Sequence, residues 1–192
     1  MLNDKYIEEL PDQFKQSYLD YKQGIYEIEP WGSHQPVLIH TLNTITEGNV
    51  LEIGMGFCST PLIHLICQKQ NRNILSLDYE QEFFKKLSSY ENDKHKMFVF
   101  TINKLLNKEY DFFKERFSIV FVDASPGWIR QKFIELIKDN ADYIIVHDTE
   151  AIKEYSYDFS MFKYVLPFTK VKKQTSILSN LDTINKNLLQ IF

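Results

Sequence analysis

The stretch of sequence that decides the fold is residues 51–60, Leu51-Glu52-Ile53-Gly54-Met55-Gly56-Phe57-Cys58-Ser59-Thr60. An apolar run ends in two glycines, which let the backbone turn tightly and approach a ligand without side-chain obstruction. Thr60 followed by Pro61 predicts a helix N-cap and a proline in the first turn. The free N–H groups of such a helix would point at the turn, where they suit a carboxylate or phosphate.

Short apolar runs recur along the chain at a regular interval. Their starts lie 24, 24, 21 and 24 residues apart, which leaves room for one helix between successive runs. Alternating strands and helices at this interval predict βαβ units and a parallel sheet. The five predicted strands are Asn49–Ile53, Asn73–Leu77, Met97–Thr101, Ser118–Val122 and Asp142–Val146.

The remaining segments complete this pattern. Mixed apolar and charged faces predict helices over 81–90 and 130–138, and two further strands over 162–171 and 175–181 predict a terminal hairpin. Near the start, Phe14, Tyr18, Tyr21 and Ile25 have helical spacing. Ser33 could cap a second helix that runs through residues 37–42. We therefore expect a single domain, residues 1–192, with the helical segment 1–48 contributing to the substrate side.

Composition limits the class of protein. A hydrophobic content of 44% is typical of a globular chain, and no apolar run approaches the roughly 20 residues that span a bilayer. The first residues do not resemble a signal peptide, so we expect a cytoplasmic protein without a membrane partner. Cys58 and Cys67 form no Cys-x-x-Cys pair, and the five histidines are scattered, which argues against a structural metal. The net charge of −4 argues against a nucleic-acid partner.

The second predicted strand is followed directly by an acidic residue. Asp78 comes 24 residues after Gly54, and a carboxylate there can accept both hydrogen bonds of a ribose diol. A glycine turn together with an acidic residue at this spacing indicates a nucleoside-containing cofactor. The alternative is a tight turn beside a solvent-exposed aspartate.

Residues 52–56 resemble motif I of class I methyltransferases, an acidic residue, any residue, then Gly-x-Gly-x-Gly, with Cys58 in place of the third glycine. The resemblance covers residues 30–192 and implies S-adenosylmethionine as cofactor. It also implies a Rossmann-like α/β fold, with a mostly parallel seven-stranded sheet, a terminal antiparallel hairpin and helices on both faces. The expected cofactor-binding residues are Ser33, His34, Glu52, Gly54, Gly56, Ser59, Thr60, Asp78 and Asp123.

A dinucleotide-dependent dehydrogenase begins with a similar unit. Its fingerprint requires glycines two and five positions after the first. Gly56 satisfies the first requirement, but Ser59 stands at the second. The spacing therefore favours the methyltransferase.

Two carboxylates follow the fourth and fifth predicted strands. Asp123 and Asp148 should meet at one edge of a parallel sheet, where they could hold a divalent cation. This resembles catechol and caffeoyl-CoA O-methyltransferases, which bind magnesium through an aspartate and an Asp-Asn pair. Here Thr149 replaces the asparagine and the lysine base has no clear counterpart near Trp128. Metal dependence by Mg²⁺ is left open, and no residue is assigned as a metal ligand.

The predicted catalytic residues are Asp123, His147 and Asp148. His147 has a pKa suited to removing a proton from a substrate hydroxyl, although strand alternation would place it opposite Asp148 unless the strand has ended. The segment from Trp31 to Pro36 resembles the one that covers the methionine end of the cofactor in these enzymes; it could equally be a helix cap.

We expect methyl transfer to a hydroxyl or carboxyl oxygen of a small molecule. The alternatives are a catalytically inactive binding protein with the same fold, or an RNA ribose methyltransferase, whose Asp-x-x-Pro is matched at 123–126 but whose lysine after the fifth strand is not. No large insertion supplies the substrate pocket. Its wall must come from the N-terminal helices, a partner in a homodimer, or both.

Overall fold

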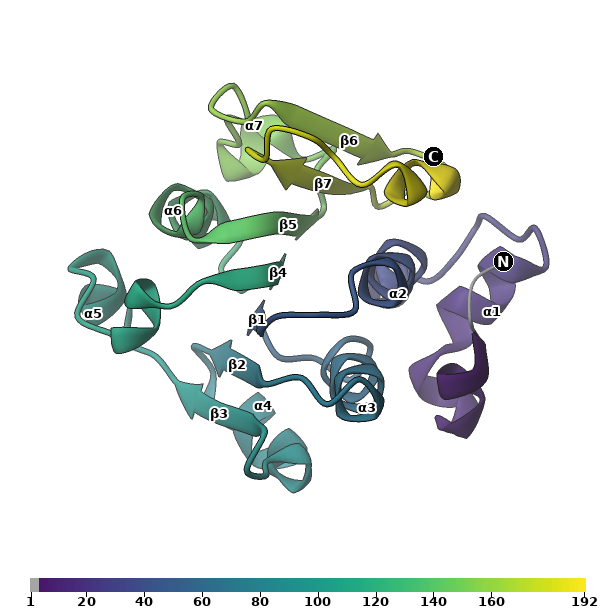
Figure 1. Ribbon diagram of the computed structural model, residues 1–192, viewed down its shortest axis with the longest axis horizontal. Helices are drawn as coiled ribbons and strands as arrows, with labels where there is room; N and C mark the ends of the chain where they lie inside the picture. The colour runs from purple at the N-terminus through teal and green to yellow at the C-terminus, as the bar shows by residue number, and fades with distance from the viewer. Residues whose placement is uncertain (1–3) are drawn as a thin grey trace.

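The computed structural model describes residues 4–192, and its centre is one seven-stranded sheet (Figure 1). The strand order is β3-β2-β1-β4-β5-β7-β6. β1 to β5 run parallel, whereas β7 lies antiparallel to both β5 and β6. This confirms the Rossmann-like class I methyltransferase fold with its terminal hairpin. The strands are β1 Val50–Ile53, β2 Ile74–Asp78, β3 His95–Val99, β4 Phe117–Val122, β5 Ala141–His147, β6 Tyr164–Phe168 and β7 Thr175–Ser179.

The strand order reverses at β1. The chain leaves β1 toward β2 and β3 on one side, then returns to place β4 and β5 on the other. Ile53 at the end of β1 is therefore paired with Leu77 of β2 and with Val122 of β4. In open parallel sheets, ligands bind at the carboxyl ends of the strands at this point of reversal.

Helices cover both faces of the sheet (Figure 1). One face packs against α2 and α3, with α4 beside β3 and α1 outside α2; the other packs against α5 and α6, with α7 beside α6. The α-helices are α1 Gln16–Lys22, α2 Gln35–Thr44, α3 Thr60–Lys69, α4 Gln81–Leu87, α5 Ile102–Leu106, α6 Trp128–Ile137 and α7 Ile152–Tyr155. Short 3-10 turns are Asp4–Glu9, Asp12–Phe14, Pro30–Gly32, Ser88–Tyr90, Asp111–Lys114 and Lys186–Ile191.

Successive strand residues face opposite layers, as the pleat requires. Val50 belongs to the apolar cluster on the α2–α3 side, and Leu51 to the cluster on the α6 side. Both central strands are buried along their whole length, which explains why they appear in the sequence as continuous apolar runs. In the part of the chain described, no helix is both long and apolar enough to cross a membrane.

Three local expectations are wrong. The N-terminal helix begins only at Gln16 and ends before Gly24, whose φ of +80° breaks it, so Ile25 is exposed. Ser33 does not cap α2; His34 precedes the helix, and its side chain makes no cap hydrogen bond. Ser59 rather than Thr60 occupies the N-cap position of α3, and its side chain makes no cap hydrogen bond. The hydroxyl groups of both residues donate to the buried Glu52 carboxylate instead.

Candidate active site

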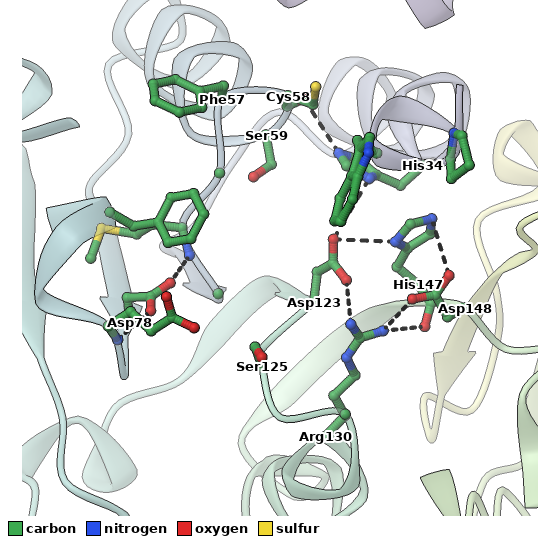
Figure 2. Close-up of a pocket in the computed structure, with 18 of the residues that line it drawn as sticks. His34, Phe57, Cys58, Ser59, Asp78, Asp123, Ser125, Arg130, His147 and Asp148 are labelled. Atoms are coloured by element: carbon green, nitrogen blue, oxygen red, sulfur yellow. Dashed lines mark hydrogen bonds and ion pairs between the residues drawn. The ribbon is translucent and has the colours of Figure 1, made fainter. Parts of the chain in front are cut away.

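A pocket of about 810 Å³ opens at the carboxyl ends of β1, β2, β4 and β5. Figure 2 shows Asp78 at one end of it and Asp123, His147 and Arg130 at the other. Its volume lies within the range of small-molecule sites. The lining contains eight of the residues predicted from the sequence, namely His34, Gly54, Gly56, Ser59, Asp78, Asp123, His147 and Asp148.

The glycine turn joins the two halves of the sheet. Gly54 has φ +101°, and a Cβ there would lie 2.5 Å from the backbone carbonyl atoms of Asp123, so no other residue fits. Its N–H donates to the Leu77 carbonyl at 2.8 Å, while the Gly56 N–H donates to Thr60 Oγ1 at 3.0 Å. The turn is thus fixed before any ligand arrives.

Glu52 is fully buried beneath this turn and does not line the pocket. Its carboxylate accepts hydrogen bonds from the hydroxyl groups of Ser59 at 2.6 Å, Thr60 at 3.0 Å and Ser76 at 2.6 Å. Burial raises the pKa of Glu52 to about 7, although these three donors favour its charged form. Glu52 and Thr60, both expected to bind the cofactor, therefore do not line the pocket; they support the turn from behind.

Asp78 ends β2 and lines the pocket. One carboxylate oxygen accepts the Met55 N–H at 2.7 Å, and the other accepts the Glu80 N–H at 2.6 Å. Burial raises the pKa of Asp78 to about 6, against the opposing effect of these hydrogen bonds. Each oxygen retains a second lone pair, so both can still accept from a diol.

At the opposite end, two histidines lie against one carboxylate (Figure 2). His147 Nδ1 lies 3.2 Å from Asp123 Oδ2, and His34 Nδ1 lies 3.9 Å from the same oxygen. Burial lowers the pKa of His34 to about 4, so this ring is neutral near pH 7. Burial also acts to lower the pKa of His147, but the adjacent Asp123 carboxylate outweighs it and leaves that pKa raised.

Arg130 was not predicted, and it changes the interpretation of the two edge carboxylates. Its Nη2 lies 2.8 Å from Asp123 Oδ1, and its Nη1 lies 3.0 Å from Asp148 Oδ2. The guanidinium therefore bridges the two carboxylates where a shared Mg²⁺ would have to bind. The Mg²⁺ arrangement expected from the O-methyltransferase resemblance does not fit these residues. The sequence signal was an arginine in the first turn of the helix that follows Asp123.

His147 and Asp148 both line the pocket. β5 ends at His147, and Asp148 takes a left-handed conformation with φ +57°, so strand alternation no longer separates the two side chains. Ser33, which we expected to bind the cofactor, does not line the pocket. It is buried behind His147, with its Oγ 2.8 Å from His147 Nε2.

Tyr155 and Lys173 line the pocket but carried no clear signal in the sequence. Tyr155 of α7 stacks on Arg130, whose Cζ lies 5.0 Å from the centre of the ring. Lys173, in the turn of the hairpin, lies 3.6 Å from Asp148 and 3.0 Å from Glu150. Trp31 and His34 lie in the expected N-terminal segment, which therefore forms part of the pocket wall.

The fold and the position of this pocket place the structure among proteins with the class I methyltransferase fold. A methyltransferase from Podospora anserina bound to SAH (S-adenosylhomocysteine) has a TM-score of 0.64 at 13% identity, with 88% of each chain covered. An O-methyltransferase from Bacillus cereus, also with SAH, has a TM-score of 0.59 at 16% identity, covering 92% of this chain and 96% of that one. The fibrillarin pre-rRNA processing protein of Methanococcus jannaschii has a TM-score of 0.56 at 14% identity, covering 78% and 76%. No protein-family model and no curated protein matches the sequence.

Proposed function

We propose that this protein transfers a methyl group from S-adenosylmethionine to an oxygen of a small-molecule acceptor. The observation that carries the proposal is that one pocket joins the glycine turn and Asp78 to the Asp123–His147 pair. A nucleoside site and a proton-accepting site thus share a single cavity. The SAH-bound proteins with the same fold support the choice of cofactor.

The residues divide into two groups by role. Asp78 and the backbone of the glycine turn would hold the ribose and the amino-acid end of the cofactor. S-adenosylmethionine supplies a sulfonium-bound methyl group, so that a C–S bond breaks, an O–CH₃ bond forms and the electron pair returns to sulfur. The protein must align the acceptor oxygen with the methyl carbon and receive its proton.

The Asp123–His147 pair is the proton acceptor in this proposal. Burial raises the pKa of Asp123, but His147 and Arg130 outweigh it and leave that pKa below its ordinary value, at about 2, so the carboxylate is ionised. An ionised Asp123 stabilises the imidazolium that forms when His147 accepts a proton. Asp148, paired with Arg130, fixes the guanidinium rather than reacting.

Binding and turnover should be tested separately. Calorimetry should show binding of S-adenosylhomocysteine and none of NAD, after which a panel of hydroxyl and carboxyl acceptors is screened with labelled S-adenosylmethionine. His147→Ala should lower the transfer rate about 10²–10⁴-fold with cofactor affinity little changed. Binding of NAD but not of S-adenosylhomocysteine would contradict the proposal.

The same experiment separates the alternatives. Cofactor binding without transfer to any acceptor would favour an inactive binding protein. Transfer to RNA but not to small molecules would favour the ribose methyltransferase. The net charge of −4 and the pairing of Arg130 with two carboxylates support the small molecule. A homodimer and a cytoplasmic location stay predictions.

A further inference from the structure

Ligand-type atoms of three residues converge at the Asp123 end of the pocket. The residues are the buried His34 and His147 and the partly exposed Asp123, with one ligand atom of each within 4.8 Å of the others; Nδ1 of each histidine faces Asp123 Oδ2. Atoms bound about 2.0–2.2 Å from one ion lie roughly 3–3.6 Å apart at octahedral or tetrahedral angles. The distances of 3.2 Å and 3.9 Å to Asp123 Oδ2 are close to this range. The two rings meet edge to face, with their centroids 4.9 Å apart.

The hydrogen bond on the far side of His34 fixes its tautomer. Nε2 lies 3.3 Å from the Cys58 carbonyl oxygen, which can only accept. Nε2 must therefore carry the proton, so in the neutral ring Nδ1 is a bare lone pair. This Nδ1 is buried and has no hydrogen-bond partner among the described residues. A buried lone pair aimed at a carboxylate is destabilising unless a positive charge lies between them.

The tautomer of His147 is fixed in the same way, by its hydrogen bond to Ser33. The Ser33 hydroxyl donates its single proton to the Pro30 carbonyl at 2.9 Å, so it accepts from His147 Nε2 at 2.8 Å. In the neutral ring, His147 Nδ1, which also lacks a well-aligned hydrogen-bond partner in the described chain, then faces Asp123 Oδ2 at 3.2 Å as a second lone pair. Histidines that bind metals typically donate their other ring N–H to such fixed oxygen acceptors.

The charges around the cluster suit a cation. Asp123, Asp148 and Glu150 supply three carboxylates, whereas Arg130 and Lys173 supply two positive charges. With both histidines neutral, these five groups carry one net negative charge. Arg130 holds the other oxygen of Asp123, so Oδ2 is the oxygen directed at the two histidines.

We propose that His34, His147 and Asp123 bind a divalent transition-metal ion. Two imidazoles and one carboxylate suit Zn²⁺, Fe²⁺ or Co²⁺ rather than Mg²⁺, which prefers oxygen ligands. Three protein ligands leave coordination positions open toward the pocket. An acceptor hydroxyl bound there would ionise more readily, and with the ion bound His147 and Asp123 would act as its ligands rather than as the proton acceptor. This role rests on the proposed function, whereas the metal site itself does not.

The decisive experiment measures the ion without the cofactor. Chelator-treated protein is titrated with Co²⁺, followed by visible absorption, and with Zn²⁺, followed by calorimetry. We expect one ion per chain. His34→Ala and His147→Ala should each weaken binding by at least about 100-fold, and Ser33→Ala should weaken it about 10- to 100-fold as an outer-shell change. His34→Gln replaces the alanine variant if the latter does not fold.

His40 offers a matched control. It is buried, and its Nε2 lies 3.0 Å from the Asn187 carbonyl oxygen. Among the residues that the structure describes, its Nδ1 also lacks a partner, but it belongs to no ligand cluster. His40→Ala should bind the ion like the wild type. No binding, or binding that His34→Ala and His147→Ala leave unchanged, would overturn the metal site and leave Asp123 and His147 as a metal-free pair.

The two proposals fail separately. Absence of the ion with intact S-adenosylhomocysteine binding and transfer would remove only the metal site. Ion binding without any S-adenosylhomocysteine binding would remove the methyltransferase function but keep the site. If both hold, adding a chelator should suppress transfer while S-adenosylhomocysteine affinity stays within a few-fold.

Discussion

If Asp78 binds the ribose as proposed, cofactor affinity should depend on pH. A ribose diol donates to a carboxylate, so binding would favour the ionised form of Asp78. Because its pKa is raised to about 6, affinity for S-adenosylhomocysteine should be constant above that pH and fall up to tenfold per unit below it. Calorimetry between pH 5 and 8 measures this dependence.

Asp78→Asn provides the control for the pH dependence. The variant should bind about 1.5–3 kcal/mol more weakly and lose the dependence between pH 5 and 6. Glu80, a neighbouring carboxylate that also lines the pocket, serves as the comparison, and Glu80→Gln should retain both affinity and dependence. If the Asn variant keeps the wild-type pH profile, the titrating group lies elsewhere, with His147 the next candidate.

Glu52 should make the free energy of unfolding fall as pH rises, whereas a carboxylate in an ordinary ion pair makes it rise. Its folded pKa of about 7 exceeds its ordinary 4.5, so the folded protein keeps a proton that the unfolded chain has lost. The stabilisation is complete below pH 4.5 and disappears as pH rises through 7, at up to about 1.4 kcal/mol per unit. Urea unfolding at several pH values should show a flatter profile for Glu52→Gln; an unchanged slope would contradict this assignment.

Among the structural elements, the turn after β1 contains two glycines, Gly54 and Gly56, which differ in whether a larger side chain fits. Gly54→Ala should destabilise by about 2–6 kcal/mol, since it combines a positive φ with a clash against the Asp123 backbone. Gly56→Ala, whose Cβ would meet nothing closer than Ser59 Oγ at 3.5 Å, should change stability by less than about 1 kcal/mol. Denaturant unfolding of the two variants tests this difference. Equal losses in the free energy of unfolding would show that the turn accepts a side chain at neither position.

The elements that could be predicted from the sequence are those governed by local patterns. The buried strands β1 to β5 appear as apolar runs, and each lies within two residues of its expected start. The caps of α2 and α3 were missed because Ser33 and Thr60 bond to groups distant in sequence, namely His147 and Glu52. Arg130 was missed for the same reason, since its two carboxylate partners belong to different strand ends.

At the scale of the whole molecule, the pocket collects side chains from both halves of the sheet. Asp78 ends β2 on one side of the reversal, whereas Asp123 follows β4 and His147 ends β5 on the other. His34, contributed by the N-terminal segment, lies against Asp123 and His147. A ligand that spans the pocket would therefore contact both halves of the sheet and the N-terminal segment.

Because the pocket joins these parts, binding of S-adenosylhomocysteine should stabilise all of them together against unfolding. S-adenosylhomocysteine at 100 times its dissociation constant contributes about 2.7 kcal/mol, which for a chain of this length raises Tm by about 5–10 °C. Scanning calorimetry should show a single transition moving upward as a whole. Asp78→Ala, at the same ligand concentration, should show a smaller rise because its binding is weaker. A second transition that ignores the ligand would mean that residues 4–192 do not unfold cooperatively, and that part of the chain folds without the pocket.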